Sequence, residues 1–238
     1  MPHLFHTAPP TNRYYAWFEA LHTRVDILLL GPQPEQVFGA VCERMRECLA
    51  AVVQMGNRFN PDSELSRAVA GATVRPMPLS ANLYTLLHRC LQAHRDTGGL
   101  FDITVCSPHF EPGFMRYVEL TSDRCLRLHR PGLVVDLSGV LKGYALEQLR
   151  RLLTGEGIAN ALVNLGNSSI LSLGDNPSDI APGHCLTTSG NATASRRHIM
   201  NPLTGRYVEG QGEVSVTTAD GVEGEVQSIV AFIRQGGA

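Results

Sequence analysis

One residue of this 238-residue chain stands out as a candidate for chemistry, because Lys142 is the only lysine among 20 lysine and arginine side chains. An ammonium is a compact charge that fits beside a phosphate or a metal, whereas a guanidinium is a wide planar group. Lys142 follows Asp136 and the small residues Ser138 and Gly139. We therefore consider it a candidate anion-binding residue. The alternative is that arginine bias left one lysine by chance.

The residues around Lys142 predict a strand, a short turn and a helix. The apolar run that ends at Asp136 is typical of a buried strand, and apolar positions at helical spacing follow from residue 142 to about 153. This arrangement points free backbone N–H groups and the positive end of a helix dipole at an anion. The spacing matches neither the dinucleotide glycine fingerprint nor a P-loop. A purely structural turn is the alternative.

Composition narrows the class of protein. The chain is 43% hydrophobic and 18% charged with a formal net charge of −2, which is typical of a globular protein that does not bind nucleic acid. Residues 1–13 contain no apolar core and no cysteine for lipidation, so we expect a cytoplasmic protein without a membrane anchor. The six cysteines form no Cys-x-x-Cys pair, which favours reduced, mostly buried thiols over a zinc site.

The pattern of elements predicts an α+β fold, with mixed or antiparallel sheets packed against helices. We expect a flexible arm over 1–13 and a single domain over 14–238. Helices are predicted over 34–54, 82–95 and 142–153, the second capped by Ser80 and ended by Gly98 and Gly99. Strands are predicted over 24–30, 114–120, 124–128, 133–136, 161–165, 170–173, 186–189 and 213–218.

Five segments, in order and spacing, resemble the ApbE family of FAD:protein FMN transferases. They are Asn60–Arg67, Thr97–Val105, Val135–Ala145, Ala161–Gly166 and His198–Gly205. The resemblance implies a T-fold-like architecture, FAD as substrate and Mg²⁺ as cofactor. It also implies that FMN is moved onto a Thr or Ser hydroxyl of an acceptor flavoprotein, with release of AMP.

The resemblance also assigns roles to residues. Lys142 would stabilise the pyrophosphate, and His198 would accept the proton of the attacking hydroxyl, since an imidazole titrates near neutral pH. A surface histidine that begins a turn is the alternative for His198. The implied cofactor-binding residues are Asp102, Thr104, Asp136, Ser138, Gly139, Lys142, Gly143, Tyr144 and Gly166. The implied metal site comprises Leu141, Glu225 and Ser228.

Several positions depart from the family pattern. Val69 and Asn201 stand where the family has an asparagine and an aspartate, Glu225 replaces a metal-binding aspartate, and Ile229 replaces a metal-binding threonine. Magnesium prefers near-octahedral oxygen coordination, so we expect weaker metal binding than is usual. Two further functions stay open: a non-catalytic flavin-binding or partner protein, and hydrolysis of FAD to FMN and AMP. The sequence predicts neither the acceptor nor the oligomeric state.

Overall fold

The computed structural model describes residues 3–7, 13–191, 198–209 and 212–236. The chain divides into two compact units, and each unit draws on separate stretches of sequence. The first unit comprises residues 1–52, 140–189 and 215–228, and the second comprises 53–139, 190–214 and 229–238. No single linker separates these units, because the chain passes from one to the other several times.

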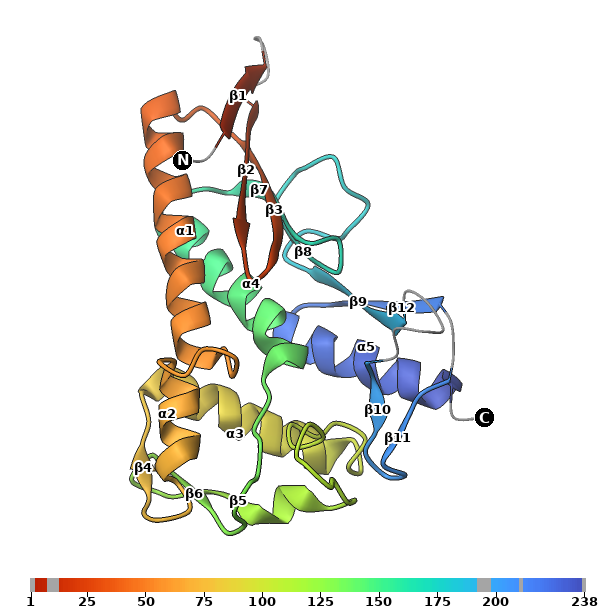
Figure 1. Ribbon diagram of the computed structural model, residues 1–238. Coiled ribbons are helices and arrows are strands. Elements are labelled where there is room, and N and C mark those ends of the chain that lie inside the picture. The colour runs from red at the N-terminus through yellow and green to blue at the C-terminus, as the bar shows by residue number, and fades with distance from the viewer. Residues whose placement is uncertain (1–2, 8–12, 192–197, 210–211, 237–238) are drawn as a thin grey trace. The chain divides into compact units, whose positions relative to one another are not determined.

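The first unit contains a seven-stranded sheet with the order β1-β2-β3-β7-β8-β9-β12 (Figure 1). Buried and less buried residues alternate along β7, where Ala161, Val163 and Leu165 are buried. The pairs from β1 to β9 are antiparallel. The strands are β1 (His3–Thr7), β2 (Arg13–Ala20), β3 (Thr23–Leu30), β7 (Asn160–Leu165), β8 (Ser169–Leu173), β9 (Cys185–Asn191) and β12 (Gly212–Thr218).

Three long helices contribute to the first unit: α1 (Glu35–Gly56), α4 (Ser138–Gly155) and the first half of α5 (Gly221–Gly236). Apolar side chains recur at helical spacing in α4, where Val140, Leu146 and Leu149 are fully buried. Their burial supplies the hydrophobic stabilisation that keeps α4 in place, which in turn positions Lys142.

The second unit is built around α2 (Glu64–Gly71) and α3 (Ala81–Asp96), with the three-stranded sheet β4-β6-β5 and the hairpin β10-β11. Ser80 caps α3 by accepting a hydrogen bond from the Leu83 N–H, as predicted. Gly98 and Gly99 follow with φ of +62° and +88°. The other elements are β4 (Met77–Pro78), the 3-10 helix η1 (Phe114–Tyr117), β5 (Val118–Leu120), β6 (Cys125–Leu128), β10 (Met200–Asn201) and β11 (Arg206–Tyr207).

The prediction of a strand and a turn before Lys142 is wrong. Residues 133–136 belong to no sheet, and α4 begins at Ser138 and runs through Gly139. The extended segment is held by separate bonds instead: the Val134 N–H donates to the Ser107 hydroxyl at 2.9 Å, and the Asp136 N–H donates to a backbone carbonyl. Asp136 Oδ1 accepts the Ser138 N–H at 2.8 Å, and this bond starts the helix early.

Other elements also differ from the sequence expectation. His3–Thr7, placed in a flexible arm by the sequence, pairs with the unpredicted strand β2. Helix α2 lies in a segment for which no helix was predicted, and so does helix α5. Phe114–Tyr117 forms a 3-10 helix where a strand was predicted. All six cysteines are free, as predicted. Within the described residues, no helix combines the length and apolar character needed to span a bilayer.

Candidate functional site

Lys142 lies in the part of α4 that belongs to the first unit. Its ammonium donates a hydrogen bond to the hydroxyl of Ser168, which lies in the turn between β7 and β8. The residue is half-buried. Because a serine hydroxyl carries no charge, this contact positions the ammonium without neutralising it. The charge that acts on this ammonium comes from the Glu225 carboxyl of the same unit.

Glu225, in the first turns of α5, is the acidic group that interacts with Lys142. Only 5% of the residue is exposed, and the Ser169 hydroxyl donates to its Oε1 at 2.6 Å. Burial raises the pKa of Glu225 to about 7, although the Ser169 hydrogen bond, the Lys142 charge and a backbone bond from Gly143 each lower it. Near neutral pH this carboxyl is therefore only partly ionised.

Two glycines allow α4 and α5 to approach so closely. A Cβ at Gly143 would lie 2.2 Å from the carbonyl oxygen of Gly221, and a Cβ at Gly221 would lie 2.6 Å from the carbonyl oxygen of Gly143. The same atom at Gly143 would be 2.7 Å from Glu225 Cγ. Gly143, which the resemblance assigns to the cofactor, thus also permits the helix crossing that holds Glu225 near Lys142.

The predicted metal ligands do not form a magnesium cage. The buried side chain of Leu141 has no oxygen, and the Ser228 hydroxyl lies 2.8 Å from that of Ser189 and donates to the Glu225 carbonyl at 3.1 Å. No group of three or more His, Cys, Asp or Glu side chains suited to a metal exists within the described part of the chain. One hydrogen-bonded carboxyl and one engaged hydroxyl do not fit the octahedral oxygen coordination that Mg²⁺ demands.

The side chain that replaces the expected threonine ligand has a structural role. Ile229 belongs to the second unit and packs against an apolar cluster there. Its Cδ1 would lie 3.1 Å from a Cβ at Gly139, which is exposed at the start of α4. The apolar cluster consists of Ile199, Val208, Phe232 and Ile233.

Asp136, in the second unit, is tied into the start of α4. Its Oδ2 lies 2.8 Å from Arg58 Nε and accepts the Cys106 thiol at 3.2 Å, while Oδ1 accepts the Ser138 N–H. Burial raises the pKa of Asp136, but the hydrogen bonds from Ser138 and Cys106 and the Arg58 charge outweigh it, so the net shift is downward. Asp136 is therefore ionised at neutral pH. Its carboxylate accepts the hydrogen bond of the Ser138 N–H, a group that we expected to face a phosphate.

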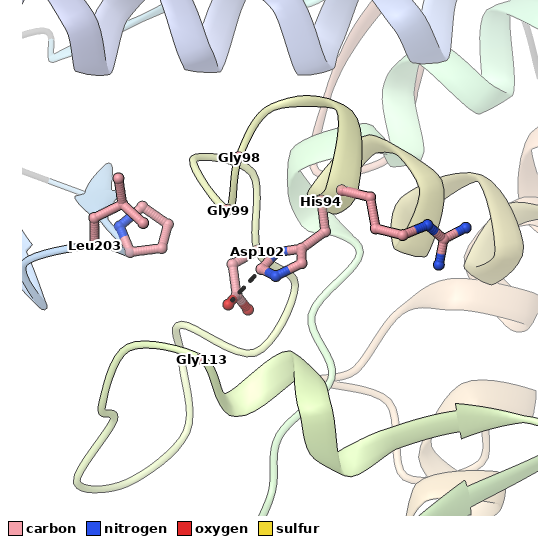
Figure 2. A pocket seen from close by; sticks show the side chains of 8 residues that line it. His94, Gly98, Gly99, Asp102, Gly113 and Leu203 are labelled. Carbon is pink, nitrogen blue, oxygen red and sulfur yellow. Dashed lines mark ion pairs between the residues drawn. The ribbon is translucent and has the colours of Figure 1, made fainter.

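Asp102 lines a cavity of about 310 Å³ in the second unit (Figure 2). The backbone N–H and the hydroxyl of Thr104 donate to Asp102 Oδ1 at 2.6 and 2.5 Å. His94 Nδ1 lies 3.9 Å from Asp102 Oδ2. Burial raises the pKa of Asp102, against the lowering effects of Thr104 and His94. The cavity is lined by His94, Arg95, Gly98, Gly99, Asp102, Gly113, Pro202 and Leu203.

Three further residues assigned by the resemblance are His198, Tyr144 and Gly166. His198 is exposed, and its backbone N–H donates to Asn191 Oδ1 at 3.4 Å. Tyr144 is buried in α4. Gly166 adopts φ of +65° after β7, and a Cβ there would lie 2.1 Å from Thr23 Oγ1. Gly166 therefore has a steric requirement for glycine that is independent of any cofactor.

The structure adds residues that the sequence did not single out. Ser168, Ser169 and Ser189 hold the side chains of Lys142, Glu225 and Ser228. Arg58 pairs with Asp136, and His94 joins Asp102. Of the three serines, only Ser168 could have been noticed in the sequence. Asn167-Ser168 stands after β7 where the family pattern that the sequence resembles has Gly-Asp. Nothing in the sequence pointed to Arg58 or His94. The partner of Arg58, Asp136, is distant in sequence, and the partner of His94, Asp102, follows a glycine-rich loop.

Comparison with known proteins identifies the family. The model of the ApbE family matches residues 21–109 and 111–236, so this chain belongs to the ApbE family. It is 27% identical over 229 residues to the FAD:protein FMN transferase of Escherichia coli (strain K12), covering 74% of this chain and 65% of that protein. The corresponding protein of Salmonella typhimurium is 27% identical over 213 residues, with 67% and 60% covered. The chain thus spans less than two thirds of the length of these relatives.

Solved structures confirm the predicted α+β architecture. The fold matches the flavin transferase ApbE of Vibrio cholerae with a TM-score of 0.82 and 19% identity, covering 94% of this chain and 87% of that one. It matches the ApbE protein of Thermotoga maritima with a TM-score of 0.78 and 18% identity, over 94% and 87% of the two chains. At such low identity these likenesses show the fold alone.

Proposed function

We propose that this chain transfers FMN from FAD to a Thr or Ser hydroxyl of an acceptor flavoprotein and releases AMP. The observation that carries the proposal is a lysine on α4, Lys142, held by Ser168 near the partly protonated carboxyl of Glu225, in a chain that belongs to the ApbE family. The relatives named FAD:protein FMN transferase support the same reaction.

The proposed reaction is a phosphoryl transfer. The acceptor oxygen attacks the phosphorus of the FMN half, a new P–O bond forms, and the pyrophosphate P–O bond breaks so that AMP leaves with the bridging oxygen. Lys142 supplies positive charge that stabilises the phosphate oxygens. His198, which is exposed, accepts the proton of the attacking hydroxyl.

Magnesium enters this proposal only as a weakly bound cation. The side chains around Glu225 do not fit a resident Mg²⁺ ion, because Ser169 and Ser228 are engaged in hydrogen bonds and Ile229 has no oxygen. No step of the reaction is therefore assigned to a metal held by these residues. The cytoplasmic location expected from the sequence stays a prediction that cell fractionation would test.

Two measurements test the function. The protein is incubated with FAD, MgCl₂ and a peptide that carries a Thr or Ser acceptor, and then peptide mass and AMP release are followed. A peptide heavier by the mass of FMN, with AMP formed in step, is the expected result. AMP formed equally without peptide would instead indicate FAD hydrolysis, and bound FAD without AMP would indicate a non-catalytic flavin-binding protein.

The base is tested by His198→Ala. We expect FAD binding to stay nearly unchanged and transfer to fall by roughly a hundredfold, the usual scale for a positioned base. His88→Ala is the matched control, because His88 is an exposed histidine of α3 that lies outside the cavity lining. If His198→Ala transfers FMN at the rate of the unmodified protein, His198 is not the base.

A further inference from the structure

Two arginines of the second unit, Arg116 and Arg130, lie against the aromatic rings of η1. The Arg116 Cζ is 4.6 Å from the centre of the Tyr117 ring, and the Arg130 Cζ is 4.1 Å from the centre of the Phe114 ring. Phe114 is fully buried, so its ring is a fixed platform for Arg130. A guanidinium that stacks through its face keeps its N–H groups in its own plane, where they can bind a ligand.

Hydrogen bonds fix the position of Arg116. Its Nη1 donates to the Gly113 carbonyl at 3.3 Å, and its Nη2 donates to the Tyr117 hydroxyl at 3.0 Å. The Arg116 hydrogen bond, the Arg116 charge and the Arg130 side chain together lower the pKa of Tyr117, against a smaller raising effect of burial. Both guanidinium groups therefore act on one hydroxyl, and each keeps N–H donors for a further partner.

No acidic side chain neutralises these two arginines within the described part of the chain. Arg116 and Arg130 are absent from the ion pairs formed there. Glu119, two residues after Tyr117, is instead paired with His129, whose Nε2 lies 2.6 Å from its Oε2. Two charged groups that are already ordered, and that have no internal partner, lose little conformational freedom when an anion binds.

The charge of the second unit favours an acidic partner. In the stretches that form this unit, arginines outnumber Asp and Glu, whereas acidic residues outnumber basic ones in the first unit. The segment that carries the two arginines also contains the exposed acidic residues Glu111, Glu119 and Asp123. A continuous row of phosphates along this segment would approach these carboxylates and be repelled. Separate carboxylates of a protein therefore suit the site better than a nucleic acid.

Arg116 also borders the cavity of the second unit. Gly113 lines that cavity, and its carbonyl accepts the bond from Arg116. A Cβ at Gly113 would lie only 2.8 Å from Arg116 Nη1. A protein bound through Arg116 would consequently lie next to this wall of the cavity.

We propose that Arg116 and Arg130 bind carboxylates of an acidic surface segment on the acceptor flavoprotein. This inference rests on the proposed function for the identity of the partner, and it adds the surface that recognises that partner. Guanidinium and carboxylate groups match in geometry, since two parallel N–H groups can donate to the two oxygens. Arg116 and Arg130 are then binding residues for the acceptor and take no part in the phosphoryl transfer.

Fluorescence anisotropy of a labelled peptide of alternating Asp and Gly, titrated with the full chain, tests the site. We expect this peptide to bind about tenfold more tightly than the same peptide with Asn in place of Asp, the upper scale for two exposed ion pairs. The double variant Arg116→Gln with Arg130→Gln should remove the difference. Arg75→Gln with Arg124→Gln is the matched control, because both arginines are exposed in the same unit and the net charge changes equally.

A single variant covers the case in which loss of Arg130 from the Phe114 ring unfolds the protein. Arg116 is exposed, so Arg116→Gln leaves the core intact, and it should weaken binding of the Asp peptide by about threefold.

Transfer kinetics give a second readout. With a peptide that carries Asp residues together with a Thr or Ser acceptor, the double variant should raise KM by about tenfold and leave kcat unchanged, because the arginines hold the peptide and not the reacting phosphate. FAD affinity should also stay unchanged.

Equal affinities for the Asp and Asn peptides, or an equal loss in the control and the double variant, would overturn the inference. Inorganic phosphate that displaces the Asp peptide at equal concentration would overturn it too, because the site would then select phosphate and not protein carboxylates. The predicted peptide preference without any FMN transfer overturns only the proposed function, whereas transfer of FMN with equal peptide affinities overturns this inference alone.

Discussion

The charge of Lys142 on α4 lowers the pKa of the buried carboxyl of Glu225 on α5, and Gly143 and Gly221 let the two helices approach closely. The resemblance implies a metal-binding aspartate at position 225. In this chain the carboxyl of Glu225 stands there, and burial keeps it partly protonated although the positive charge of Lys142 favours its ionised form. Four predictions about these residues follow, in addition to the tests given above.

Lys142→Arg should impair FAD binding and transfer together, by about tenfold or more. The wider guanidinium keeps the charge but does not fit the half-buried position beside Ser168. FAD affinity is measured by fluorescence titration and transfer by peptide mass. Arg151→Lys is the matched control, because Arg151 is exposed on the same helix. Unchanged FAD affinity in Lys142→Arg would show that the ammonium does not contact the pyrophosphate.

Glu225 should make the protein less stable as the pH rises. Its folded-state pKa is about 7 against an ordinary value of 4.5, so the folded state binds the proton more tightly. The stabilisation is present below pH 4.5 and is lost as the pH rises through 7, by about 3 kcal/mol at 1.36 kcal/mol for each pKa unit.

The pH dependence of stability is checked by urea unfolding, which gives the free energy of unfolding of Glu225→Gln and of the unmodified protein at pH 5 and pH 8. The amide cannot ionise, so the variant should gain stability relative to the unmodified protein at pH 8. Glu223→Gln serves as control, since Glu223 is exposed on the same helix. A difference between the unmodified protein and Glu225→Gln that stays constant with pH would contradict a raised pKa.

Gly143→Ala should destabilise the protein by about 1–3 kcal/mol or more, because the added Cβ would overlap the backbone of Gly221. Gly155→Ala is the matched control on the same helix, where a Cβ meets nothing within 4 Å, and it should be neutral or slightly stabilising. Urea unfolding measures both. Equal stability of the two variants would mean that the helices separate without cost.

Glu225→Asp combined with Ile229→Thr should tighten magnesium binding, because it restores a short carboxylate and an oxygen where Ile229 now packs in an apolar cluster. Calorimetry with MgCl₂ measures the affinity. Glu225→Asp with Ile229→Val is the control, since valine keeps the branched shape and adds no oxygen. Tight magnesium binding by the unmodified protein, or no gain in the threonine variant, would contradict this prediction.

Much of the architecture could be predicted from local patterns. Ser80 capping α3, the strands β7 and β8, and the apolar spacing of α4 all depend on neighbours in sequence, and the structure confirms them. The ordered segments around Asp102, Lys142 and His198 also indicated the family. Strand β2 was missed although buried and less buried residues alternate along it.

What the sequence determined by itself is the set of local elements and the types of side chain they carry, because hydrophobic spacing and caps act over a few residues. Tertiary structure alone decided that Asp136 starts α4 at Ser138, that Ser168 holds Lys142, and that Glu225 is buried and bonded to Ser169. These contacts join residues brought together only by packing. Burial and partners, rather than residue type, therefore set the pKa of Glu225 and leave Asp102 Oδ2 without a donor among the described residues.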